Sequence, residues 1–529
     1  MAMLNVMTTT RPKKTRTLCA ATATAFLLST FAAGAIGIAK PDESDIFFAA
    51  RHVPKIVIEI TGKDLNDLRA NNRVYVRCTV REDDKRVYDF VGVHLKGAAG
   101  SFRGLDDRPA LSLNFDKFRK NQVFHGMDKI HLNNSVQDGT YLNEAICRSI
   151  FNDAGIAAGR GSHAIVILNG RNLGLYTLTE GFDHTFVKRH YKNPDGILYD
   201  GGFCQDLDGQ KKVISNTPHP GQPELKALWQ AAHEPDVKKR FEKISAIVDI
   251  DHFLKFIALE LMTAHWDGYC QNRNNYRIYT DTVAKKTYLM PSGMDQMFGD
   301  PNFNLFGGVG GAVANQLLNT PEGKTRYRQV VGNLYTNVFR PEVLGERIDE
   351  MAEKLAPHGD FRGHAAGLKQ RITARANVIA NQLGVPPPAA LKFDNNQARI
   401  STGWEPKIVS GTATHAKRSI EGRGVLYVRV EGEANVSWRK NVMLAPGNYF
   451  FEGRVRTANV KGTDDLSTAA GLRISGQKRA LKIDGSKDWQ PFRYEISVGG
   501  MQEVSLVCEL ISSTGEAWFD LESLKLIRR

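Results

Sequence analysis

Three consecutive prolines, Pro386–Pro388, divide this chain into two parts with different sequence patterns. Proline lacks a backbone N–H and cannot continue a helix, so a run of three ends any preceding helix and forms a stiff spacer. Helical and strand patterns are mixed before the run, whereas short alternating strands broken by Gly and Asn follow it. The sequence therefore predicts an α+β domain at 50–385, a proline-rich linker at 386–395 and an all-β domain at 396–529, read as a sandwich or jelly roll.

Residues 1–39 have a different character from both domains. A basic stretch, Arg11–Arg16, precedes an Ala-rich apolar run, Leu18–Ala39, that ends in small residues. This order is typical of a secretory signal peptide, and an uncleaved membrane anchor is the alternative because the run is long enough to span a bilayer. Both interpretations predict that the rest of the chain lies outside the cytoplasm, at the cell surface, in the periplasm or secreted. A membrane is a partner only if the segment is retained.

Composition excludes several classes of protein. Hydrophobic residues make up 42% and charged residues 24%, as in ordinary globular proteins. The formal net charge of +13 includes the basic N-terminus and forms no long basic run, so we expect no nucleic-acid partner. The six cysteines include no Cys-x-x-Cys pair, which argues against a zinc site or a disulfide scaffold.

Strand and helix patterns fill the first domain. Period-two alternation predicts strands at 55–60, 73–80, 89–96 and 110–115. A helix at 143–152 and a hairpin at 163–168 and 173–179, joined through Asn169-Gly170, are expected next. Farther along, we expect a helix that begins at Asp249 or Asp251, a hairpin at 277–280 and 286–290, and helices at 329–338, 342–355 and 361–383. Past the prolines, strands are predicted at 425–430, 449–455, 504–510 and 517–526.

The stretch His265–Tyr276 contains one carboxylate and three carboxamides between a helix and a strand. Asparagine is unfavourable inside helices and strands, so this stretch is predicted to be a loop held by rigid elements, where functional residues concentrate. Asp295 lies in a second loop after the 277–290 hairpin, which is expected to bring it close to Asp267. Carboxylate and amide oxygens suit Mg²⁺ or Mn²⁺ better than zinc.

This donor set fits phosphoryl transfer, in which one carboxylate orients the attacking hydroxyl and another, with an Asn, holds the metal. The spacing from Asp267 to Asn272, Asp-x-x-x-x-Asn, is that of protein-kinase catalytic loops. The same spacing fits a structural interpretation, in which Asp267 caps a turn and the asparagines form Asx-turns. A third interpretation makes Asp267 and Asp295 the carboxylate pair of a glycoside hydrolase.

Several sequence blocks, in order, resemble the CotH (spore coat protein H) kinases over roughly residues 50–385. The blocks are His94–Gly97, Lys129–Asn134, Gly174–Glu180, His265–Tyr269, Asn272–Tyr276 and Gly293–Gly299. The resemblance implies an atypical protein-kinase-like fold that binds ATP with Mg²⁺ or Mn²⁺ and phosphorylates Ser or Thr of a protein substrate. The runner-up is a catalytically weak surface, adhesin or assembly protein that keeps this fold.

The resemblance also implies roles for individual residues. Asp267 takes the place of the catalytic aspartate and Asp295 that of the metal-binding aspartate. The kinase spacing favours Asn272 as a further metal ligand, whereas the block before Tyr276 favours Asn275. Lys96 is the expected phosphate-contacting residue; a solvated lysine at the end of a strand is the alternative.

Two acidic residues lie near the expected nucleotide site, and the sequence leaves two interpretations for each. Glu180 is expected to line the nucleotide pocket, with an exposed glutamate at a strand end as the alternative. Glu144 lies on the helix after the Lys96 strand, where kinase helices carry the glutamate that pairs with lysine, but a solvated helix face is the preferred interpretation. The turn Ala98–Gly104 departs from the Asn-Ser-Ser that often follows in the family, which bears on nucleotide affinity.

The second domain resembles the jelly rolls of carbohydrate-binding modules, chiefly through Glu516–Leu521. This resemblance implies a polysaccharide partner. Trp404, Trp438 and Trp489 are the candidates for stacking on sugar rings, and burial in the core of a sandwich is the alternative.

Overall fold

The structure is a computed structural model that describes residues 42–215, 218–384, 390–479, 481–499 and 502–529. The expected signal peptide at 1–39 and the prolines at 386–388 lie outside these residues. Residues 43–529 form a single unit by their internal contacts, so the domain boundary expected at 386–395 stays a prediction.

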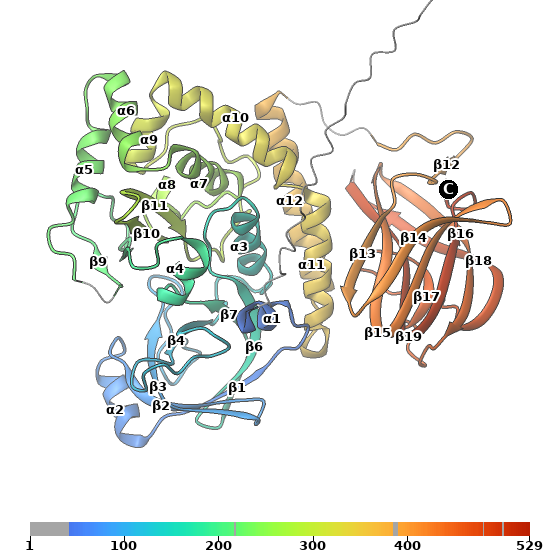
Figure 1. The fold of residues 1–529 in the computed structure, drawn as a ribbon, viewed down its shortest axis with the longest axis horizontal. Helices are drawn as coiled ribbons and strands as arrows, with labels where there is room; N and C mark the ends of the chain where they lie inside the picture. The colour runs from blue at the N-terminus through green and yellow to red at the C-terminus, as the bar shows by residue number, and fades with distance from the viewer. Residues whose placement is uncertain (1–41, 216–217, 385–389, 480, 500–501) are drawn as a thin grey trace, which may run out of the picture. The chain divides into compact units, whose positions relative to one another are not determined.

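Seven strands near the N-terminus close into a barrel in the order β1-β2-β3-β4-β5-β7-β6 (Figure 1). The barrel closes through a parallel pairing of β1 with β6, and its other pairings are antiparallel. The strands are β1 (Lys55–Glu59), β2 (Val76–Glu82), β3 (Arg86–Lys96), β4 (Ala110–Asn114), β5 (Lys129–Asn133), β6 (Gly161–Leu168) and β7 (Arg171–Glu180). Two short helices, α1 (Glu43–Ala49) and α2 (Gly62–Ala70), precede β1 and β2.

Strand alternation gives the barrel one apolar and one polar side. Leu95, Leu111 and Leu132 occupy neighbouring positions on β3, β4 and β5, and all three are buried in the barrel core. The residues between them therefore point the other way. In this manner β3, β4 and β5 present His94, Lys96, Ser112, Asn114, Lys129, His131 and Asn133 to a cavity outside the barrel.

A four-stranded sheet and a set of helices form the other wall of that cavity. The sheet has the order β11-β10-β8-β9, with strands β8 (Ile197–Asp200), β9 (Lys212–Val213), β10 (Tyr276–Asp281) and β11 (Lys286–Pro291). The helices are α3 (Asn143–Asp153), α4 (His184–His190), α5 (Pro223–Ala232), α6 (Val237–Ile247), α7 (Ile250–Met262), α8 (Tyr269–Asn272), α9 (Ala312–Leu318), α10 (Pro321–Asn337), α11 (Pro341–Leu355) and α12 (Arg362–Leu383). Helix α7 lies at the centre of the largest hydrophobic core.

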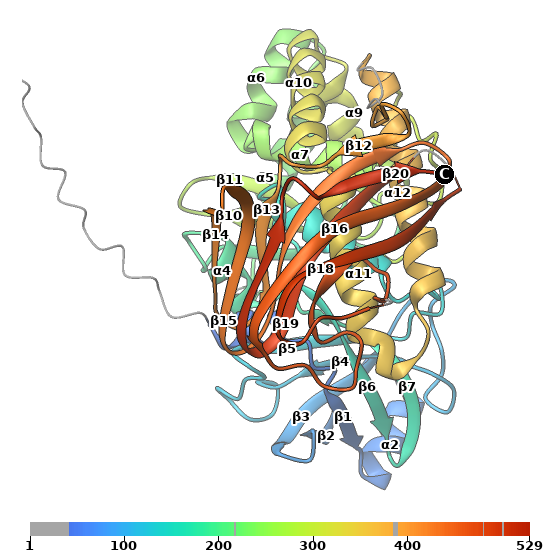
Figure 2. The same cartoon turned by 90° about the vertical axis from the view of Figure 1, so that its right-hand side faces the viewer.

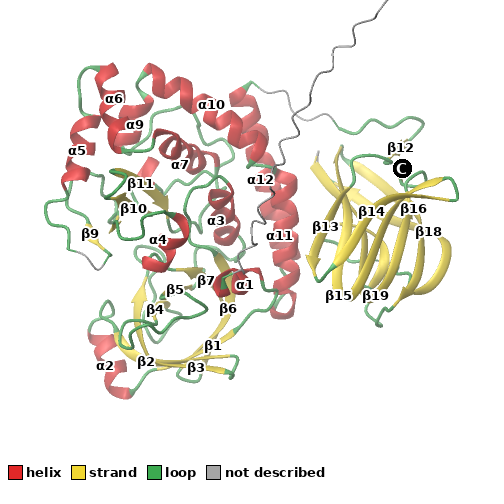
Figure 3. Cartoon of the chain, viewed as in Figure 1, coloured by secondary structure: helices red, strands yellow, loops and turns green. Residues whose placement is uncertain are grey.

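Past the linker the described chain is built from strands, as the colouring in Figure 3 shows. The strands are β12 (Gln397–Arg399), β13 (Glu405–Ser410), β14 (Ala413–Ile420), β15 (Arg423–Leu444), β16 (Gly447–Val460), β17 (Ala469–Ile474), β18 (Gly485–Val498), β19 (Gln502–Asp520) and β20 (Lys525–Arg528). Long strands β15, β16 and β19 each pair with several partners and curve around a separate core (Figure 2).

Two of the three tryptophans proposed to stack on sugars belong to this C-terminal core. Trp404 is 2% exposed and Trp438 is 3% exposed, and both donate their ring N–H to backbone carbonyls. Their rings are covered, so the stacking hypothesis is wrong for these two residues. Trp489 is half-buried.

The mixed α and β content expected from the sequence is confirmed. One expected helix and one expected strand have different ends in the structure. The helix expected at 329–338 begins at Pro321, because Thr320 caps it by accepting a hydrogen bond from the backbone N–H of Gly323. The strand expected at 517–526 ends at Asp520, and β20 follows a turn. The kinase-like and jelly-roll assignments stay predictions.

The burial of α7 predicts how the free energy of unfolding changes when one of its side chains is shortened. Ile257 is fully buried in the core, whereas Ile46 on α1 is 56% exposed. We expect Ile257→Ala to lower the free energy of unfolding by about 2–5 kcal/mol, because it leaves a cavity. Ile46→Ala, the matched control, should change it by less than about 1 kcal/mol. Chemical denaturation measures both, and equal losses would contradict the packing described for α7.

Candidate functional site

Helix α7 delivers the chain to the first candidate loop. Asp249 caps the helix by accepting a hydrogen bond from the backbone N–H of His252 at 3.0 Å. The helix ends at Met262, and Ala264 then adopts a left-handed conformation with φ 54°. Alanine is strained in this region, which turns the chain sharply into His265–Asp267.

Asp267 is surrounded by amide donors. The side-chain N–H groups of Asn272, Asn274 and Asn275 donate to its carboxylate at 2.5, 3.1 and 2.7 Å. Arg273 and Asn275 have φ values of 54° and 49°, which turn the loop back on itself so that all three amides reach one carboxylate. The amide nitrogens of these residues face Asp267, and their oxygens are left for other partners.

A buried carboxylate, Glu260, shapes this loop from inside α7. It is fully buried and accepts hydrogen bonds from the backbone N–H groups of Tyr269 and Cys270 at 3.1 and 2.7 Å, at the start of α8. A Cβ at Gly268 would lie 2.6 Å from a Glu260 oxygen and 2.7 Å from Nδ1 of His265, so only glycine fits there. His265 is 2% exposed, which agrees with a packing role rather than acid–base chemistry.

The second candidate loop follows β11 and is joined to the first by the hairpin. Tyr276 of β10 pairs with Pro291 of β11, and the backbone N–H of Ser292 donates to the carbonyl of Asn275 at 2.8 Å. Gly293, at φ 56°, packs against the Asn275 side chain with no room for a Cβ. The hairpin therefore places the Asn275 side chain between the Asp267 loop and the Asp295 loop.

Two buried side chains hold the Asp295 loop from other helices. Asn143 on α3 donates its amide N–H to the carbonyls of Asp295 and Met297 at 3.0 and 3.1 Å. Arg375 on α12 is fully buried and donates to the carbonyls of Leu261 and Met262 at the end of α7. Its remaining N–H groups donate to the carbonyls of Pro301 and Phe303, beyond Asp295.

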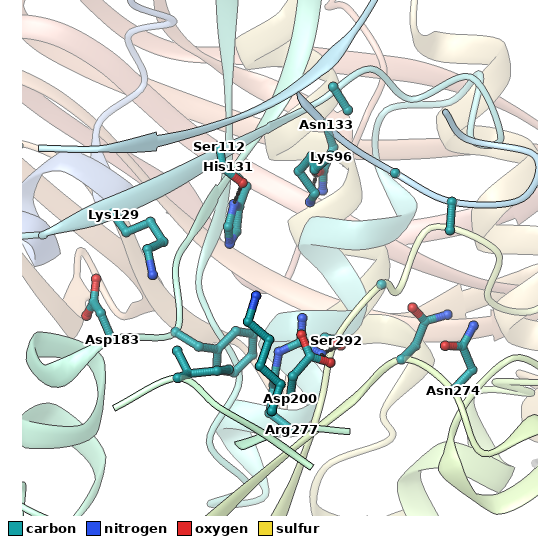
Figure 4. A pocket seen from close by; sticks show the side chains of 18 of the residues that line it. Lys96, Ser112, Lys129, His131, Asn133, Asp183, Asp200, Asn274, Arg277 and Ser292 are labelled. Carbon is teal, nitrogen blue, oxygen red and sulfur yellow. Dashed lines mark hydrogen bonds and ion pairs between the residues drawn. The ribbon is translucent and has the colours of Figure 1, made fainter. Parts of the chain in front are cut away.

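These loops face the barrel across a cavity of about 1120 Å³ (Figure 4). Asp267, Asn272, Asn275, Asp295 and Lys96 all line it, so the structure brings together five of the six residues predicted from sequence. The exception is Glu180, which is absent from the lining, is 2% exposed and forms ion pairs with Arg160 and Arg189. Its expected place in a nucleotide pocket is corrected to a buried structural ion pair.

Lys96 is held by a chain of polar side chains. Its Nζ donates to the side-chain oxygen of Asn133 at 2.5 Å, and the Asn133 amide N–H donates to Glu144 at 2.6 Å. Glu144 also accepts a hydrogen bond from Arg148 at 2.7 Å and is 2% exposed. The preferred expectation of a solvated Glu144 is therefore wrong, because its carboxylate is buried and hydrogen-bonded by Asn133 at the end of β5 and by Arg148 on the same helix.

Burial and neighbouring charges shift the pKa values of Lys96, Glu144 and Asp295. Burial lowers the pKa of Lys96 to about 8, opposed by the charge of Glu144. Burial alone would raise the pKa of Glu144, but Arg148 and Lys96 hold it below its usual value. Burial, and then the negative charge of Glu144 and Asp138, raises the pKa of Asp295 to about 6.

A divalent cation fits this donor set. Asp295 is a largely buried carboxylate that is repelled by Glu144 and Asp138, and a cation would relieve this repulsion. Within the described ranges, no group of three or more His, Cys, Asp or Glu side chains is arranged to hold a metal ion. Mg²⁺ typically binds one or two carboxylates and completes its shell with water and substrate phosphates, so Asp295 with an Asn oxygen suffices.

The sequence profile of the CotH kinase protein family matches residues 93–361, which is half of the chain, and the chain belongs to this family. Invasin CotH3 of Rhizopus delemar is 23% identical, over 47% of this chain and 53% of that protein. Inner spore coat protein H of Bacillus subtilis is 21% identical, over 45% of this chain and 71% of that protein. The chain spans about half the length of the invasins that it matches.

The solved structures that resemble this chain do so weakly. TmCBM61 in complex with β-1,4-galactotriose has a TM-score of 0.18 and 12% identity, over 24% of this chain and 90% of that chain. The CBM22-1 xylan-binding domain of Paenibacillus barcinonensis Xyn10C has a TM-score of 0.17 and 13% identity, over 25% and 88%. Scores this low carry no argument about fold or ligand. None of the helices in the described ranges is long and apolar enough to cross a bilayer.

Removal of the Arg375 side chain tests the tie between the two loops. Arg375→Met leaves buried carbonyls unpaired, and we expect the free energy of unfolding to fall by about 3 kcal/mol or more. Arg371→Met is the matched control one turn earlier on α12, because within the described residues Arg371 makes no hydrogen bond or ion pair. It should cost less than about 1 kcal/mol. Similar losses in urea denaturation of the two variants would show that Arg375 does not tie the loops.

The pKa of Lys96 predicts a pH-dependent affinity for polyphosphate. Below pH 8 the amine is protonated and attracts anions, and above pH 8 it loses its charge. We expect the affinity for inorganic triphosphate, measured by calorimetry, to fall up to about tenfold between pH 8 and 9. Lys96→Met should abolish this fall, and Lys117→Met, at an exposed cavity residue, should keep it. The same pH dependence in all three proteins would exclude Lys96 as its source.

Proposed function

We propose that this chain transfers the γ-phosphoryl group of ATP to a Ser or Thr hydroxyl of a protein, with Mg²⁺ or Mn²⁺ as cofactor. The observation that carries the proposal is the meeting of Asp267, Asp295 and Lys96 in one cavity, in a chain of the CotH kinase protein family. Catalysis of phosphoryl transfer is mostly positioning and charge neutralisation, and these residues supply both.

Asp267 is the residue proposed to orient the acceptor hydroxyl and accept its proton. Three carboxamides hold its carboxylate in one orientation, which limits the reorganisation needed at the moment of reaction. Lys96, anchored through Asn133, neutralises charge on the phosphates of the nucleotide. This anchoring fixes the ammonium before the nucleotide arrives.

Asp295 is the proposed cation ligand, together with the side-chain oxygen of Asn275 or Asn272. Asn275 has the better position, since its amide N–H groups point to Asp267 and its side chain packs against Gly293 in the Asp295 loop. The cation would supply positive charge to the phosphate oxygens during transfer.

The proposed location is the cell surface or the exterior, as the N-terminal pattern predicts and as the names of the spore coat and invasin relatives suggest. The acceptor is accordingly proposed to be a secreted or surface protein. A polysaccharide partner at 396–529 would have to be bound without Trp404 and Trp438. The partly exposed Trp518, which lies beside Tyr427 at 5.6 Å between ring centroids, is the better candidate.

A catalytically weak surface protein is the second candidate, and the turn after Lys96 favours it. Arg103 in this turn donates to the carbonyls of Gly100 and Phe102 and lies 3.7 Å from Asp107, so it does not reach into the cavity. Arg108 donates to Tyr141 and stacks on Tyr176. Neither arginine is available to a nucleotide.

Phosphoryl transfer from radiolabelled ATP separates the two candidates. The full chain is incubated with [γ-³²P]ATP and Mn²⁺ or Mg²⁺, with itself and dephosphorylated casein as acceptors. We expect wild type to incorporate label and Asp267→Asn or Asp295→Asn to lose at least about 100-fold in rate. Asp300→Asn, at an exposed position of the same loop as Asp295, is the control and should be near wild type. Equal background label in all four proteins would refute the kinase proposal.

A further inference from the structure

Two exposed aromatic side chains, Trp266 and Phe203, line the cavity that contains Asp267. Trp266 is 48% exposed and Phe203 is 57% exposed, whereas most large apolar side chains of the chain are buried. Within the described residues, neither ring makes an aromatic or cation–π contact, and the indole N–H of Trp266 donates no hydrogen bond. Exposed aromatic rings in a concave site are typical anchors for a partner.

The turn that ends α7 holds Trp266 in an outward position. Ala264 has a φ of 54°, and the backbone N–H of Trp266 donates to the carbonyl of Ala264 at 2.9 Å. The preceding side chain, His265, is 2% exposed. The backbone thus buries the imidazole and leaves the indole in solvent, one residue before the proposed catalytic carboxylate of Asp267.

Phe203 belongs to the loop after β8, which is fastened to the Asp267 loop. Gly201 donates its backbone N–H to the carbonyl of Tyr276 at 3.1 Å, and the Tyr276 hydroxyl donates to the carbonyl of Gln205 at 2.7 Å. Tyr276 therefore holds the chain on both sides of Phe203. It directly follows Asn275, whose amide donates to the Asp267 carboxylate, so the two aromatic rings come from loops that share one anchor.

The charged residues closest to the two rings along the chain already have partners. Asp200 pairs with Arg277 at 3.3 Å, and Asp206 accepts a hydrogen bond from the backbone N–H of Ala312 at 2.7 Å. Asp267 accepts hydrogen bonds from three amides. What Trp266 and Phe203 add to this part of the cavity is therefore apolar surface.

We propose that Trp266 and Phe203 form a docking surface for the acceptor protein, and that this surface selects Ser or Thr residues flanked by large apolar side chains. The inference rests on the proposed function. An acceptor hydroxyl must reach the carboxylate of Asp267, so the polypeptide that carries it passes beside Trp266 and the Phe203 loop. Interfaces draw much of their affinity from a few such aromatic anchors, and apolar side chains of the acceptor are the complementary groups.

The test uses the full chain with Mn²⁺, ATP and a library of peptides that carry one central Ser. Each flanking position carries in turn Leu, Phe, Ala, Asp or Lys, and the rate of phosphorylation gives kcat/KM. Wild type should favour Leu or Phe over Ala and Asp at least about tenfold at two or more positions, because the two rings cover the larger side chains.

Two variants assign these positions to the two rings. Trp266→Ala should remove the apolar preference at one position and Phe203→Ala at another. Phe90→Ala, the matched control, should keep both preferences, because Phe90 is 56% exposed on β3 and does not line the cavity. A general loss of fold or of catalytic geometry lowers kcat/KM for all peptides together, so the ratio between peptides reports on docking alone.

Every outcome supports or overturns the docking surface. Where proteins but no peptides are phosphorylated, the same preferences are read from phosphosites mapped by mass spectrometry on casein and on the chain itself. Phosphorylation without apolar preference, or with the preference intact in both variants, overturns the docking surface and leaves the proposed function standing. Wild type that phosphorylates no acceptor contradicts the proposed function itself. A dimer that becomes a monomer in the Trp266→Ala, Phe203→Ala double variant, measured by sedimentation, assigns the rings to a second copy and also overturns the docking surface.

Discussion

The site depends first on one buried cation. Arg375 is fully enclosed, and burial lowers its pKa to about 10, so the fold tolerates it only because backbone carbonyls surround it. Two of these carbonyls end α7, where the helix dipole favours positive charge, and two belong to the segment past Asp295. One side chain on α12 therefore fixes the ends of both loops. The Asp267 loop and the Asp295 loop cannot move independently without leaving charge or carbonyls unpaired in the core.

Other buried polar groups, on α7 and α3, extend this arrangement. Glu260 on α7 holds the start of α8, Asn143 on α3 holds the carbonyl of Asp295, and Glu144 positions Lys96 through Asn133. A network of this kind is favourable only when its members are satisfied together, which ties the geometry of the cavity to the integrity of the fold. These residues lie within 93–361, the range that the CotH kinase protein family model matches.

Local patterns predicted much of the fold and part of the site. Alternation located β1 to β4, and the Asn-Gly turn located the β6–β7 hairpin, because both signals act between near neighbours, whereas no strand was predicted at β5. The intervening hairpin predicted that Asp267 and Asp295 would lie close together, and both line one cavity. Glu144 and Glu180 were misjudged, since an acidic residue at a strand end or on a helix gives no local sign of buried arginine partners. Glu260 and Arg375 were missed, although a lone charge within an apolar helical stripe, as in Ile257–Met262, is a signal that marks such residues.

We propose that Asp295 and a neighbouring asparagine hold a cation that faces Asp267 across one cavity. Crystals grown with Mn²⁺ and a non-hydrolysable ATP analogue test it directly, because anomalous scattering locates manganese without assumption. We expect an anomalous peak at the Asp295 carboxylate, with the side-chain oxygen of Asn275 or Asn272 as a second protein ligand, and we expect Asp295→Asn to lose this peak. Manganese bound elsewhere on the chain, with none at Asp295, would contradict it.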